Sequence, residues 1–390
     1  MYPSLYYAIK DLFGINLPFL KMIQSFGFFV AMAFLLAAYF LTNELKRKET
    51  QGLLASQKVK VLKGAKATIV EYLLSGVLGF LLGYKLLFIA QHFSEFLENT
   101  QAFLLSTEGS FIGGVVLAAV SVYMKYRESE KNKLDKPQWV EETVYPHQQV
   151  GNITLIAAVA GIIGAKIFHN LENWDDFMAD PVDALLSFSG LTMYGGLIVA
   201  GFSVVYYGKK KNIAPAHLID AAAPSLMLAY AVGRIGCQIA GDGDWGIDNA
   251  KPKPHWLNML PDWMWSYDYP HNVNSVGVQM ADCFADKYCN HLAIPVFPTP
   301  FYETVMCLIL FFVLWSLRKR ITVPGVMFSL YLVLNGIERF FIEQIRVNTL
   351  YHVNGFAFTQ AELIAVLLFF TGIIGMVYAK KQFAKNHTAT

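Results

Sequence analysis

Apolar runs long enough to cross a lipid bilayer recur from Leu17 to Tyr378, with short segments rich in lysine and arginine between several of them. A helix needs about 20 mainly apolar residues to cross the hydrocarbon. That rule predicts nine spans, near residues 19–41, 68–90, 109–125, 150–168, 190–207, 215–238, 300–317, 325–345 and 358–379. Only 15% of the residues are charged, against about 25% in a soluble domain. We therefore expect an all-α, polytopic integral membrane protein that forms one membrane domain over residues 1–390.

Lysine and arginine lie in alternate loops of this topology. The basic clusters fall at residues 46–66, 125–136, 209–211, 318–320 and 380–385. The loops at 91–110 and 170–190 contain no lysine or arginine. Because cytoplasmic loops carry an excess of these residues, we expect the N-terminus outside and the C-terminus in the cytoplasm. The net charge of only +2 and the small size of the clusters argue against nucleic-acid binding.

The loop at 241–300 is the longest and is predicted to lie on the outer side. It contains four tryptophans and several prolines, which is typical of a small cap near the membrane interface. Cys283 and Cys289 both lie in this cap. Because disulfides persist outside the cytoplasm, a bond between these cysteines and two free thiols are equally open alternatives.

Two stretches, residues 68–126 and 150–207, resemble each other. The matching positions are Gly83 with Gly164, Lys85 with Lys166, and the Gly-Gly pair at 113–114 with that at 195–196. The pattern predicts that 68–126 is an extra, duplicated hairpin added to a seven-helix core. Chance similarity between glycine-rich membrane hairpins is the alternative.

Ionisable residues inside a predicted span are informative, because an unpaired charge in hydrocarbon is costly. In the span 325–345 and just after it, Arg339, Glu343 and Arg346 are spaced i, i+4 and i+7, which places them on one helical face, with Glu338 about one step round the helix. Glu343 would then neutralise and align the two arginines and leave Arg339 to bind an anionic group. A simple ladder of ion pairs along the helix is the alternative.

Three further segments carry polar groups toward the same predicted outer face. Arg234 stands in an apolar span, and a glycine-rich turn with Asp242 and Asp244 follows it. A guanidinium fork and backbone N–H groups suit a phosphate. The remaining candidates are Tyr194 beside Gly195 and Gly196, and Tyr302 beside Glu303, at the outer starts of two other spans. Interfacial aromatic anchors and helix-packing glycines are the alternative interpretations.

Taken in order, these motifs resemble those of one family, the bacterial prolipoprotein diacylglyceryl transferases. The segment MADPVDALLSFSGLTMYGGLI is similar to the family's Ala-Asp-Pro loop and Gly-Gly helix. The segment GRIGCQIAGDGDWG is similar to its signature, PTPFYE to its Pro-x-x-x-Tyr-Glu element, and GIERFFIEQIR to its late Arg-x-x-x-Glu-x-x-Arg helix. The ordered set is more specific than any single motif.

The resemblance implies an enzyme of the bacterial inner membrane that transfers the diacylglyceryl group of phosphatidylglycerol to the lipobox cysteine in the signal peptide of a preprolipoprotein. A thioether would form and glycerol phosphate would leave, in a bilayer-level cavity that opens to the outer side. Arg234 and Arg339 would hold the lipid phosphate, which would stabilise the departing charge. Glu343 and Arg346 would support the two arginines, and Tyr194 would be a catalytic residue. Asp242 would take the signature's acidic position, and Tyr302 and Glu303 would lie at the entrance. The residues that would shape the cavity are Gly195, Gly196, Gly236 and Gly246.

Three positions depart from the family pattern. Tyr194 stands where many members have histidine before the Gly-Gly pair, and tyrosine, with an ordinary pKa of about 10, is a poorer base at neutral pH. Cys237 stands where many members have asparagine. The acidic position maps to Asp242 with one extra residue before Trp245. Neither arginine is lost.

Two rival functions remain open. Tyr194, Cys237 and the long cap are compatible with a diverged transferase that uses another phospholipid or another thiol. A transporter or channel built on the internal repeat would use Arg339 and Glu343 in an ion path, but these charges lie outside the repeat. The nine histidines are scattered without metal-ligand spacing, so we expect no metal and no cofactor.

Overall fold

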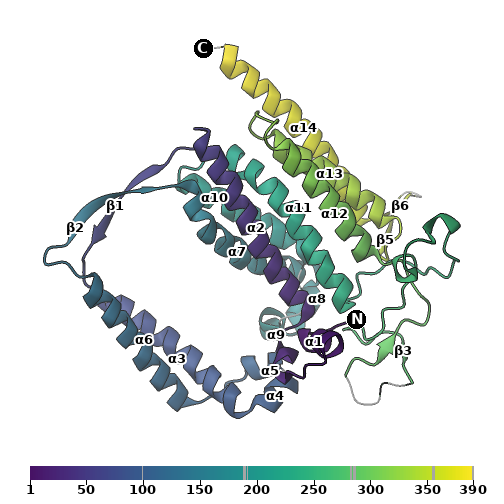
Figure 1. The fold of residues 1–390 in the computed structure, drawn as a ribbon, viewed down its shortest axis with the longest axis horizontal. Helices are drawn as coiled ribbons and strands as arrows, with labels where there is room; N and C mark the ends of the chain where they lie inside the picture. Colours follow the sequence, from purple (N-terminus) through teal and green to yellow (C-terminus); the bar gives the residue numbers. More distant parts are fainter. Residues whose placement is uncertain are drawn as a thin grey trace. The chain divides into compact units, whose positions relative to one another are not determined.

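The structure is a computed structural model that describes residues 1–98, 100–187, 190, 192–281, 283, 287–353 and 356–388. Helices dominate it (Figure 1). Six helices of the described residues are long and apolar enough to cross a membrane. They are α2 (Ser25–Thr50), α3 (Ile69–Gln91), α7 (Val150–Glu172), α11 (Pro215–Ala240), α12 (Thr299–Leu317) and α14 (Gln360–Thr388). The chain is therefore a mostly helical integral membrane protein.

Helices also cover the other three predicted spans. They are α6 (Phe111–Asn132), α10 (Met193–Lys210) and α13 (Val326–Glu343). These helices are less apolar, because α6 and α10 end in charged residues and α13 carries Glu338, Arg339 and Glu343 in its last six residues. The first span begins later than predicted, at Ser25, because residues Pro18–Met22 form a 3-10 turn, η1, after the short helix α1 (Leu5–Phe13).

The chain divides into two compact units. The first comprises Met1–Leu54, Pro146–Thr154 and Val205–Thr390, and the second comprises Ala55–Tyr145 and Leu155–Val204. That residues 1–390 form one membrane domain stays a prediction.

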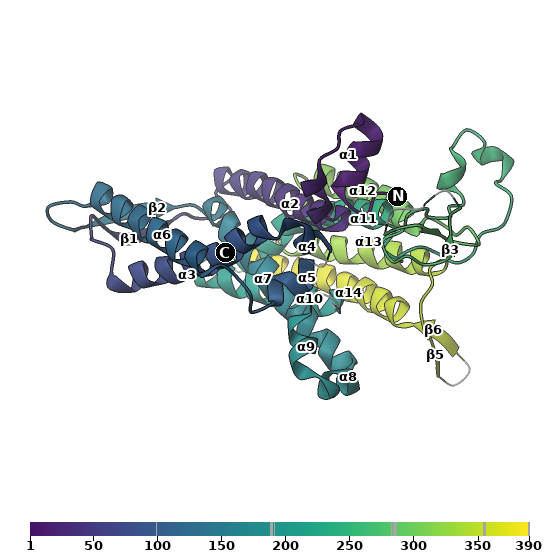
Figure 2. The same ribbon diagram turned by 90° about the horizontal axis from the view of Figure 1, so that it is seen from below.

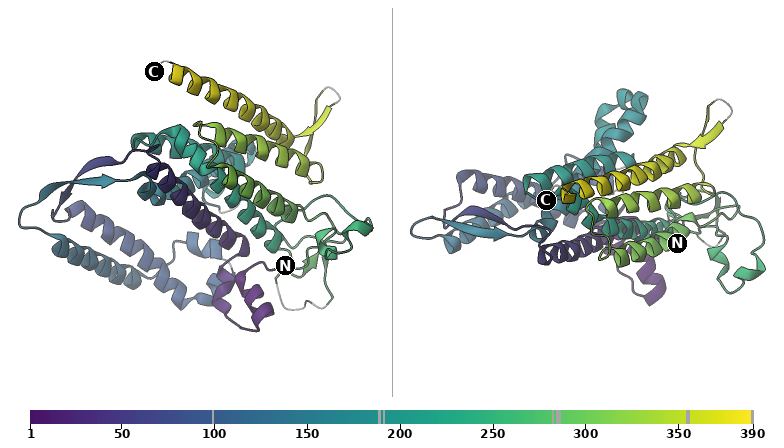
Figure 3. Two further views of the ribbon diagram at one scale, coloured as in Figure 1. Left: turned by 45° about the horizontal axis from the view of Figure 1, so that its top comes forward. Right: turned by 90° about the horizontal axis from the view of Figure 1, so that it is seen from above.

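In the first unit, α2, α11, α12, α13 and α14 pack side by side (Figures 1 and 3). Helix α11 lies along both α2 and α12, and α13 lies along α14. The buried side chains where α2, α11, α12 and α13 meet include Ala33, Met227, Ala231, Cys307, Phe311, Leu314 and Met327. Helix α11 is thus the central helix of this unit, and it carries Arg234.

A buried carboxylate fixes the start of α13. Asp220 on α11 accepts hydrogen bonds from the backbone N–H groups of Gly325 at 2.7 Å and Phe328 at 2.9 Å. The first N–H groups of a helix have no partner within the helix, and a side-chain oxygen that accepts from them caps it. Because Asp220 belongs to α11, this cap fixes α13 against α11. The cap therefore helps to align the charged side chains that the two helices carry.

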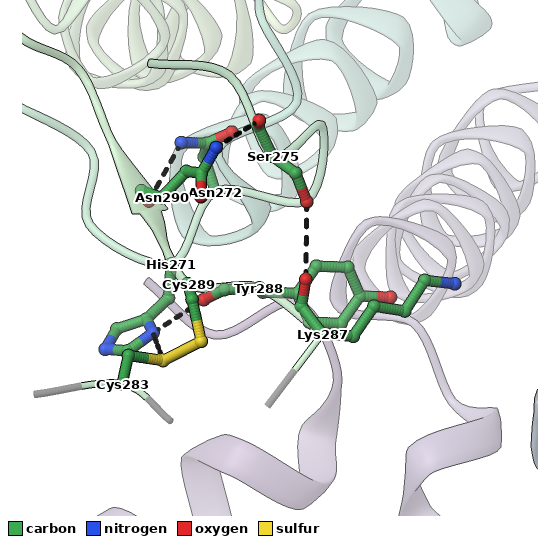
Figure 4. Close-up of a disulfide and its surroundings, with 8 residues drawn as sticks. All are labelled: His271, Asn272, Ser275, Cys283, Lys287, Tyr288, Cys289 and Asn290. Carbon is green, nitrogen blue, oxygen red and sulfur yellow. Dashed lines mark hydrogen bonds between the residues drawn. A yellow bond between two sulfur atoms is a disulfide. The ribbon is translucent and has the colours of Figure 1, made fainter. Parts of the chain in front are cut away.

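Between α11 and α12 the chain forms an irregular outer segment. It contains the 3-10 turns η3 (His255–Leu257) and η4 (Asp262–Met264) and a small sheet of β3 (Val278–Gln279) with β4 (Asn290–His291). Cys283 and Cys289 form a disulfide in this segment (Figure 4). Of the two alternatives left by the sequence, the structure has the bonded one. Beside it, Nδ1 of His271 donates to the carbonyl oxygen of Tyr288 at 2.8 Å.

Two of the connections between helices contain short antiparallel strand pairs. In the first unit, β5 (Leu350–Val353) pairs with β6 (Phe356–Thr359) between α13 and α14 (Figure 2). In the second unit, β1 (Gln57–Lys63) pairs with β2 (Gln138–Val144). The alternation of lysine and apolar residues in β1 has the period of a strand, which a search for spanning helices does not detect.

The second unit contains two helical hairpins. The antiparallel β1–β2 pair forms a stem from which the first hairpin, α3 and α6, extends (Figure 1). Short helices α4 (Phe93–Glu98) and α5 (Thr100–Leu105) join α3 to α6. The second hairpin is α7 and α10, with α8 (Trp174–Ala179) and α9 (Pro181–Leu186) between them, and the 3-10 turn η2 (Pro146–Gln149) precedes α7.

Glycines bring the helices of both hairpins into close contact. A Cβ added at Gly83 would lie 2.2 Å from the carbonyl oxygen of Gly113. A Cβ added at Gly164 would lie 2.6 Å from the carbonyl oxygen of Gly195. The matching glycines of the sequence repeat therefore meet in equivalent ways, as small residues do where membrane helices pack closely.

Candidate active site

Three arginines from distant parts of the chain converge on one carboxylate. Glu303, on α12, is completely buried. Its Oε2 atom lies 2.6 Å from Nε of Arg234, and its Oε1 atom lies 3.0 Å from Nη1 of Arg339 and 3.3 Å from Nη1 of Arg346. Tyr230 donates its hydroxyl to the same Oε1 atom at 3.2 Å. Glu303 is thus the centre of the cluster, and not the entrance residue that the sequence comparison implied.

Two more carboxylates complete the cluster. Asp244 forms ion pairs with both Arg234 and Arg346. Glu343 pairs with Nη2 of Arg339 at 3.1 Å and accepts a hydrogen bond from Asn348. Each arginine therefore contacts at least two acidic oxygens. Such matched charges lower the cost of holding arginines in a low-dielectric setting.

Two of the arginines lie in helices, and the third lies in the segment that follows a helix. Arg234 lies in the last two turns of α11, and its guanidinium carbon lies 5.3 Å from the centre of the Tyr230 ring, where a cation is attracted to the ring face. Arg339 lies within α13. Arg346 follows the end of α13 and pairs in a short β-bridge with Gly246.

The prediction that Arg346 shares a helical face with Arg339 and Glu343 is wrong. Helix α13 ends at Glu343. The next residues turn tightly, and the backbone N–H of Ile247 then bonds to the carbonyl oxygen of Ile345 at 2.9 Å. This pairing with the outer segment ends the helix. It brings Arg346 to Asp244, which a continuous helix would not do.

Asp244 is the acidic member of the glycine-rich turn that contacts the arginines, whereas the motif comparison pointed to Asp242. Burial by itself raises the pKa of Asp244, but the guanidinium groups of Arg234 and Arg346 outweigh that effect and hold its pKa below the ordinary value. Burial, together with the nearby Asp244, raises the pKa of Asp242. Oδ1 of Asp242 accepts from the backbone N–H of Asp244 at 3.3 Å, so Asp242 supports the turn.

The other predicted residues of the first unit have structural contacts. Tyr302 donates its hydroxyl to the carbonyl oxygen of Met264 at 2.7 Å and so ties α12 to the outer segment. A Cβ at Gly236 would lie 3.0 Å from Cβ of Phe29, because α11 and α2 touch there. A Cβ at Gly246 would likewise come too close to the carbonyl oxygen of Ile345. These glycines permit close packing beside the arginines.

Tyr194, Gly195 and Gly196 belong to the second unit and lie in the first turn of α10. Tyr194 is half-buried, and Gly195 is buried against α7. Their geometry is that of a tightly packed helix start.

Sequence reasoning missed one member of the site, Tyr230, and left Asp244 and Glu338 out of the predicted site. Asp244 lies in the glycine-rich turn, ten residues after Arg234, but the motif comparison favours Asp242. Tyr230 lies one helical turn before Arg234, a spacing that predicts contact. Glu338 on α13 is buried, and neither of its carboxylate oxygens has a hydrogen-bond partner among the described residues. A carboxylate inside a predicted span was the available signal for Glu338.

One group could be considered for a metal. Cys237, Asp242 and Asp244 place potential ligand atoms within 4.8 Å of one another. However, Nη1 of Arg234 lies 3.7 Å from Sγ of Cys237 and also pairs with Asp244. A fixed positive charge already occupies the position that a cation would take, so these residues fit an ion-pair network better than a metal site.

Three arginines and three carboxylates packed together between the helices of a membrane protein define a charged cluster that could bind an anionic group. The chain belongs to the prolipoprotein diacylglyceryl transferase family, whose sequence model matches residues 134–378. The match includes all three arginines and excludes the α3–α6 hairpin.

Curated relatives agree with this assignment. Three of them are named phosphatidylglycerol–prolipoprotein diacylglyceryl transferase. The protein of Dehalococcoides mccartyi is 26% identical over 230 residues, which cover 58% of this chain and 76% of the relative. The protein of Streptococcus agalactiae is 25% identical over 275 residues, covering 70% of this chain and 90% of the relative. The protein of Leptospira interrogans is 28% identical over 224 residues, covering 50% of this chain and 61% of the relative.

Proposed function

We propose that the chain transfers the diacylglyceryl group of phosphatidylglycerol to the lipobox cysteine in the signal peptide of a preprolipoprotein. Family membership and the names of the relatives support the reaction. The observation that carries the proposal for this chain is the cluster in which Arg234 and Arg339 share the carboxylate of Glu303.

The reaction exchanges one bond for another at the lipid. The cysteine sulfur attacks the carbon of the diacylglyceryl group that bears the phosphate ester. A carbon–sulfur bond forms, the carbon–oxygen bond breaks, and glycerol phosphate leaves with the electron pair of that bond. The thiol proton is lost to a base. Because the ordinary pKa of a cysteine thiol is about 8.5, the reaction needs a base or a cationic field near neutral pH.

The arginines would stabilise the leaving group. Each guanidinium is a planar fork of N–H donors that suits a phosphate, and fixed donors aimed at developing charge lower the barrier. Glu303, Asp244 and Glu343 hold these forks in place before the lipid arrives. The lipid phosphate would bind to donors that the carboxylates leave available, or displace one carboxylate.

The remaining residues are proposed to take part in the same reaction. Tyr194 is proposed as a catalytic residue, which supplies its hydroxyl in place of the histidine of many family members. Arg346 supports the two phosphate-binding arginines. The other proposed contributors to the substrate cavity are Gly195, Gly196, Gly236, Gly246, Asp242 and Tyr302.

The proposed setting is the bacterial inner membrane, with the lipid entering from the bilayer. Nine spans would place the N-terminus outside and the C-terminus in the cytoplasm, in accord with the lysine and arginine clusters. The arginine cluster lies at the ends of α11 and α13 that adjoin the outer segment, which supports an active site that opens outward. The disulfide of Cys283 and Cys289 agrees with an oxidising compartment there.

The α3–α6 hairpin is proposed to be a duplicate of the α7–α10 hairpin that was added to a seven-helix core. Nζ of Lys85 donates to the carbonyl oxygen and the hydroxyl of Ser106, at 2.5 and 3.1 Å. Nζ of Lys166 donates to the same two atoms of Ser187, at 3.0 and 2.9 Å. In both cases, the residue of the second hairpin lies 81 positions after its counterpart in the first hairpin. The hairpin also lies outside the family match.

A transfer assay tests the function. Purified protein, phosphatidylglycerol and a lipobox peptide are incubated, and the peptide is analysed by mass spectrometry. We expect a diacylglyceryl mass on the cysteine that disappears in Arg234→Ala. Absence of this product, when a well-characterised relative gives it with the same substrates, would overturn the proposal. Other phospholipids would then be screened, because Tyr194 and Cys237 favour a diverged transferase as the second candidate.

A further inference from the structure

One carboxylate beside the arginine cluster is not bound by an arginine. Glu338, on α13, is only 2% exposed, and neither of its carboxylate oxygens has a hydrogen-bond partner among the described residues. A buried polar group without a partner costs free energy, so its presence in a native fold calls for an explanation. A substrate group that pairs with Glu338 during the reaction would supply one.

The other three carboxylates of the cluster are already committed to arginines. Each of Glu303, Asp244 and Glu343 forms an ion pair with at least one guanidinium group. A proton added to any of them would remove the negative charge that holds its arginine in place. Glu338 can accept a proton without the loss of such an ion pair. It is therefore the carboxylate of this region best suited to exchange a proton with a substrate.

Glu338 borders the cluster on the side that faces away from the outer segment. It lies five residues before the end of α13 at Glu343, which is about 7.5 Å along a helix axis. On its far side it interacts electrostatically with Cys307 on α12, one turn beyond Glu303, and with Tyr331 on α13. On its near side it interacts with Glu303 and with all three arginines.

The attacking sulfur would lie on this same side of the arginines. In the proposed orientation the outer segment lies at the outer surface of the membrane. The diacylglyceryl group of a lipid whose phosphate binds the arginines therefore extends away from that segment. Displacement at a saturated carbon needs the attacking atom in line with the leaving oxygen and opposite to it. The cysteine sulfur would thus approach from the diacylglyceryl side of the phosphate, on which Glu338 lies.

From the burial, the lack of a partner and the position of Glu338, we infer that this carboxylate is the base that accepts the thiol proton of the lipobox cysteine. The inference rests on the proposed function. The sulfur–hydrogen bond breaks and an oxygen–hydrogen bond forms on Glu338 while the sulfur bonds to the carbon. The carbon–oxygen bond breaks, and glycerol phosphate leaves with its electron pair. Glu338 gives the proton to water once the products have left.

Glu338→Gln tests this inference, because it removes the base and keeps the size of the side chain. With the full chain, phosphatidylglycerol and a lipobox peptide, we expect turnover to fall about 100-fold, a usual contribution of a general base. The KM for the lipid should not change. The matched control, Glu71→Gln at an exposed position of α3, should keep normal turnover. Near-native turnover of Glu338→Gln, or a raised KM with normal turnover, would overturn the inference.

A peptide with selenocysteine in place of the lipobox cysteine separates a base from a structural role. A selenol is a much stronger acid than a thiol and is ionised near neutral pH without the help of a base. Glu338→Gln should therefore recover most of its turnover with the selenocysteine peptide. Arg234→Ala should stay inactive with both peptides, because it lacks a group that stabilises the leaving phosphate. A Glu338→Gln variant that is equally slow with both peptides would overturn the inference.

Glu338→Asp covers the case in which the amide variant does not fold. It keeps a carboxylate but withdraws it by one methylene group. We expect the ratio of the selenocysteine rate to the cysteine rate to rise above that of the unaltered protein, and an unchanged ratio would overturn the inference. If the unaltered protein forms no product with either peptide, the proposed function fails and the inference fails with it. Product formation by the unaltered protein keeps the proposed function whatever the Glu338 variants do.

Discussion

Arg234 and Arg339 contact opposite oxygens of the same carboxylate: Nε of Arg234 lies 2.6 Å from Oε2 of Glu303, and Nη1 of Arg339 lies 3.0 Å from Oε1. The two guanidinium groups are thus held side by side by one completely buried side chain. This arrangement places the two groups that are proposed to bind the lipid phosphate together before any lipid binds. It is the basis of the first two predictions.

Arg339→Lys should lose most of the transfer activity. Lysine keeps the charge but cannot contact Glu303, Glu343 and a phosphate with a planar fork. Removing one donor to developing charge typically costs about 100-fold or more in turnover. Steady-state rates of glycerol phosphate release measure this. Near-native turnover of the variant would show that Arg339 does not bind the phosphate.

Glu303→Gln should weaken both the fold and the activity. The amide has nearly the same shape, but three arginines lose the negative charge between them. Breaking a buried ion pair by removing one partner typically costs about 3–5 kcal/mol. Thermal unfolding in detergent should therefore begin at a clearly lower temperature. Phe301→Leu, a neighbour on α12 outside the ion pairs, is the control. An unchanged melting temperature for Glu303→Gln would refute the central place of this carboxylate.

Tyr194→Phe tests whether the hydroxyl group of Tyr194 takes part in the reaction. If it does, turnover should fall by about 100-fold, the usual contribution of a positioned proton-transfer group, while melting temperature and expression stay normal. Tyr194→His restores the residue that many family members have, and we expect it to be active. A normal rate for Tyr194→Phe would leave Tyr194 as an interfacial anchor.

The stability of the arginine cluster should depend on pH through Asp244. Its pKa is held below the ordinary value by Arg234 and Arg346, against the effect of burial. A carboxyl whose pKa is lowered on folding stabilises the protein fully above its unfolded-state pKa of about 3.9. That stabilisation is lost as the pH falls through the lower, folded-state value. Asp244→Asn should therefore melt below the unaltered protein at pH 7, and the difference should shrink below about pH 4. A difference that is constant from pH 7 to pH 3 would contradict this account.

Removal of the α3–α6 hairpin should leave an active enzyme. Residues Gln57 and Val144 face each other at the base of the β1–β2 stem. Below the stem, Glu49 accepts hydrogen bonds from the backbone N–H and from Nδ1 of His147, both at 2.7 Å, so the chain ends are held together without the hairpin. A deletion of residues 58–143 with a Gly-Gly linker should retain turnover close to that of the full chain. A folded but inactive deletion variant would show that the hairpin takes part in function.

Much of the helical framework could be predicted from the sequence, because a membrane span is a local signal of length and apolarity. Helix α3, for example, begins at Ile69, within one residue of its predicted start. The site was less predictable, because its geometry depends on where helices end. Arg346 was assigned to a helix that stops at Glu343, and the choice between Asp242 and Asp244 depends on a turn whose shape no spacing rule gives.

Other features needed the three-dimensional structure for different reasons. The β1–β2 stem pairs segments about 80 residues apart in sequence, a non-local contact that single-sequence patterns do not report. Whether Cys283 and Cys289 are bonded depends on how close they lie in space, which the sequence does not give. The central position of Glu303 depends on its ion pairs with three arginines from two other segments. The sequence motif around Glu303 therefore does not show whether this residue lies at the centre of the cluster or at the entrance of the substrate cavity.

The most direct test of the central claim is the ratio of the two products. Glycerol phosphate and lipidated peptide are quantified in the same reaction, once with a lipobox peptide that contains cysteine and once with its serine counterpart. The account predicts one glycerol phosphate released for each thioether formed with the cysteine peptide, and no release with the serine peptide. Release of glycerol phosphate at the same rate with either peptide would show lipid hydrolysis in place of transfer and would contradict the account.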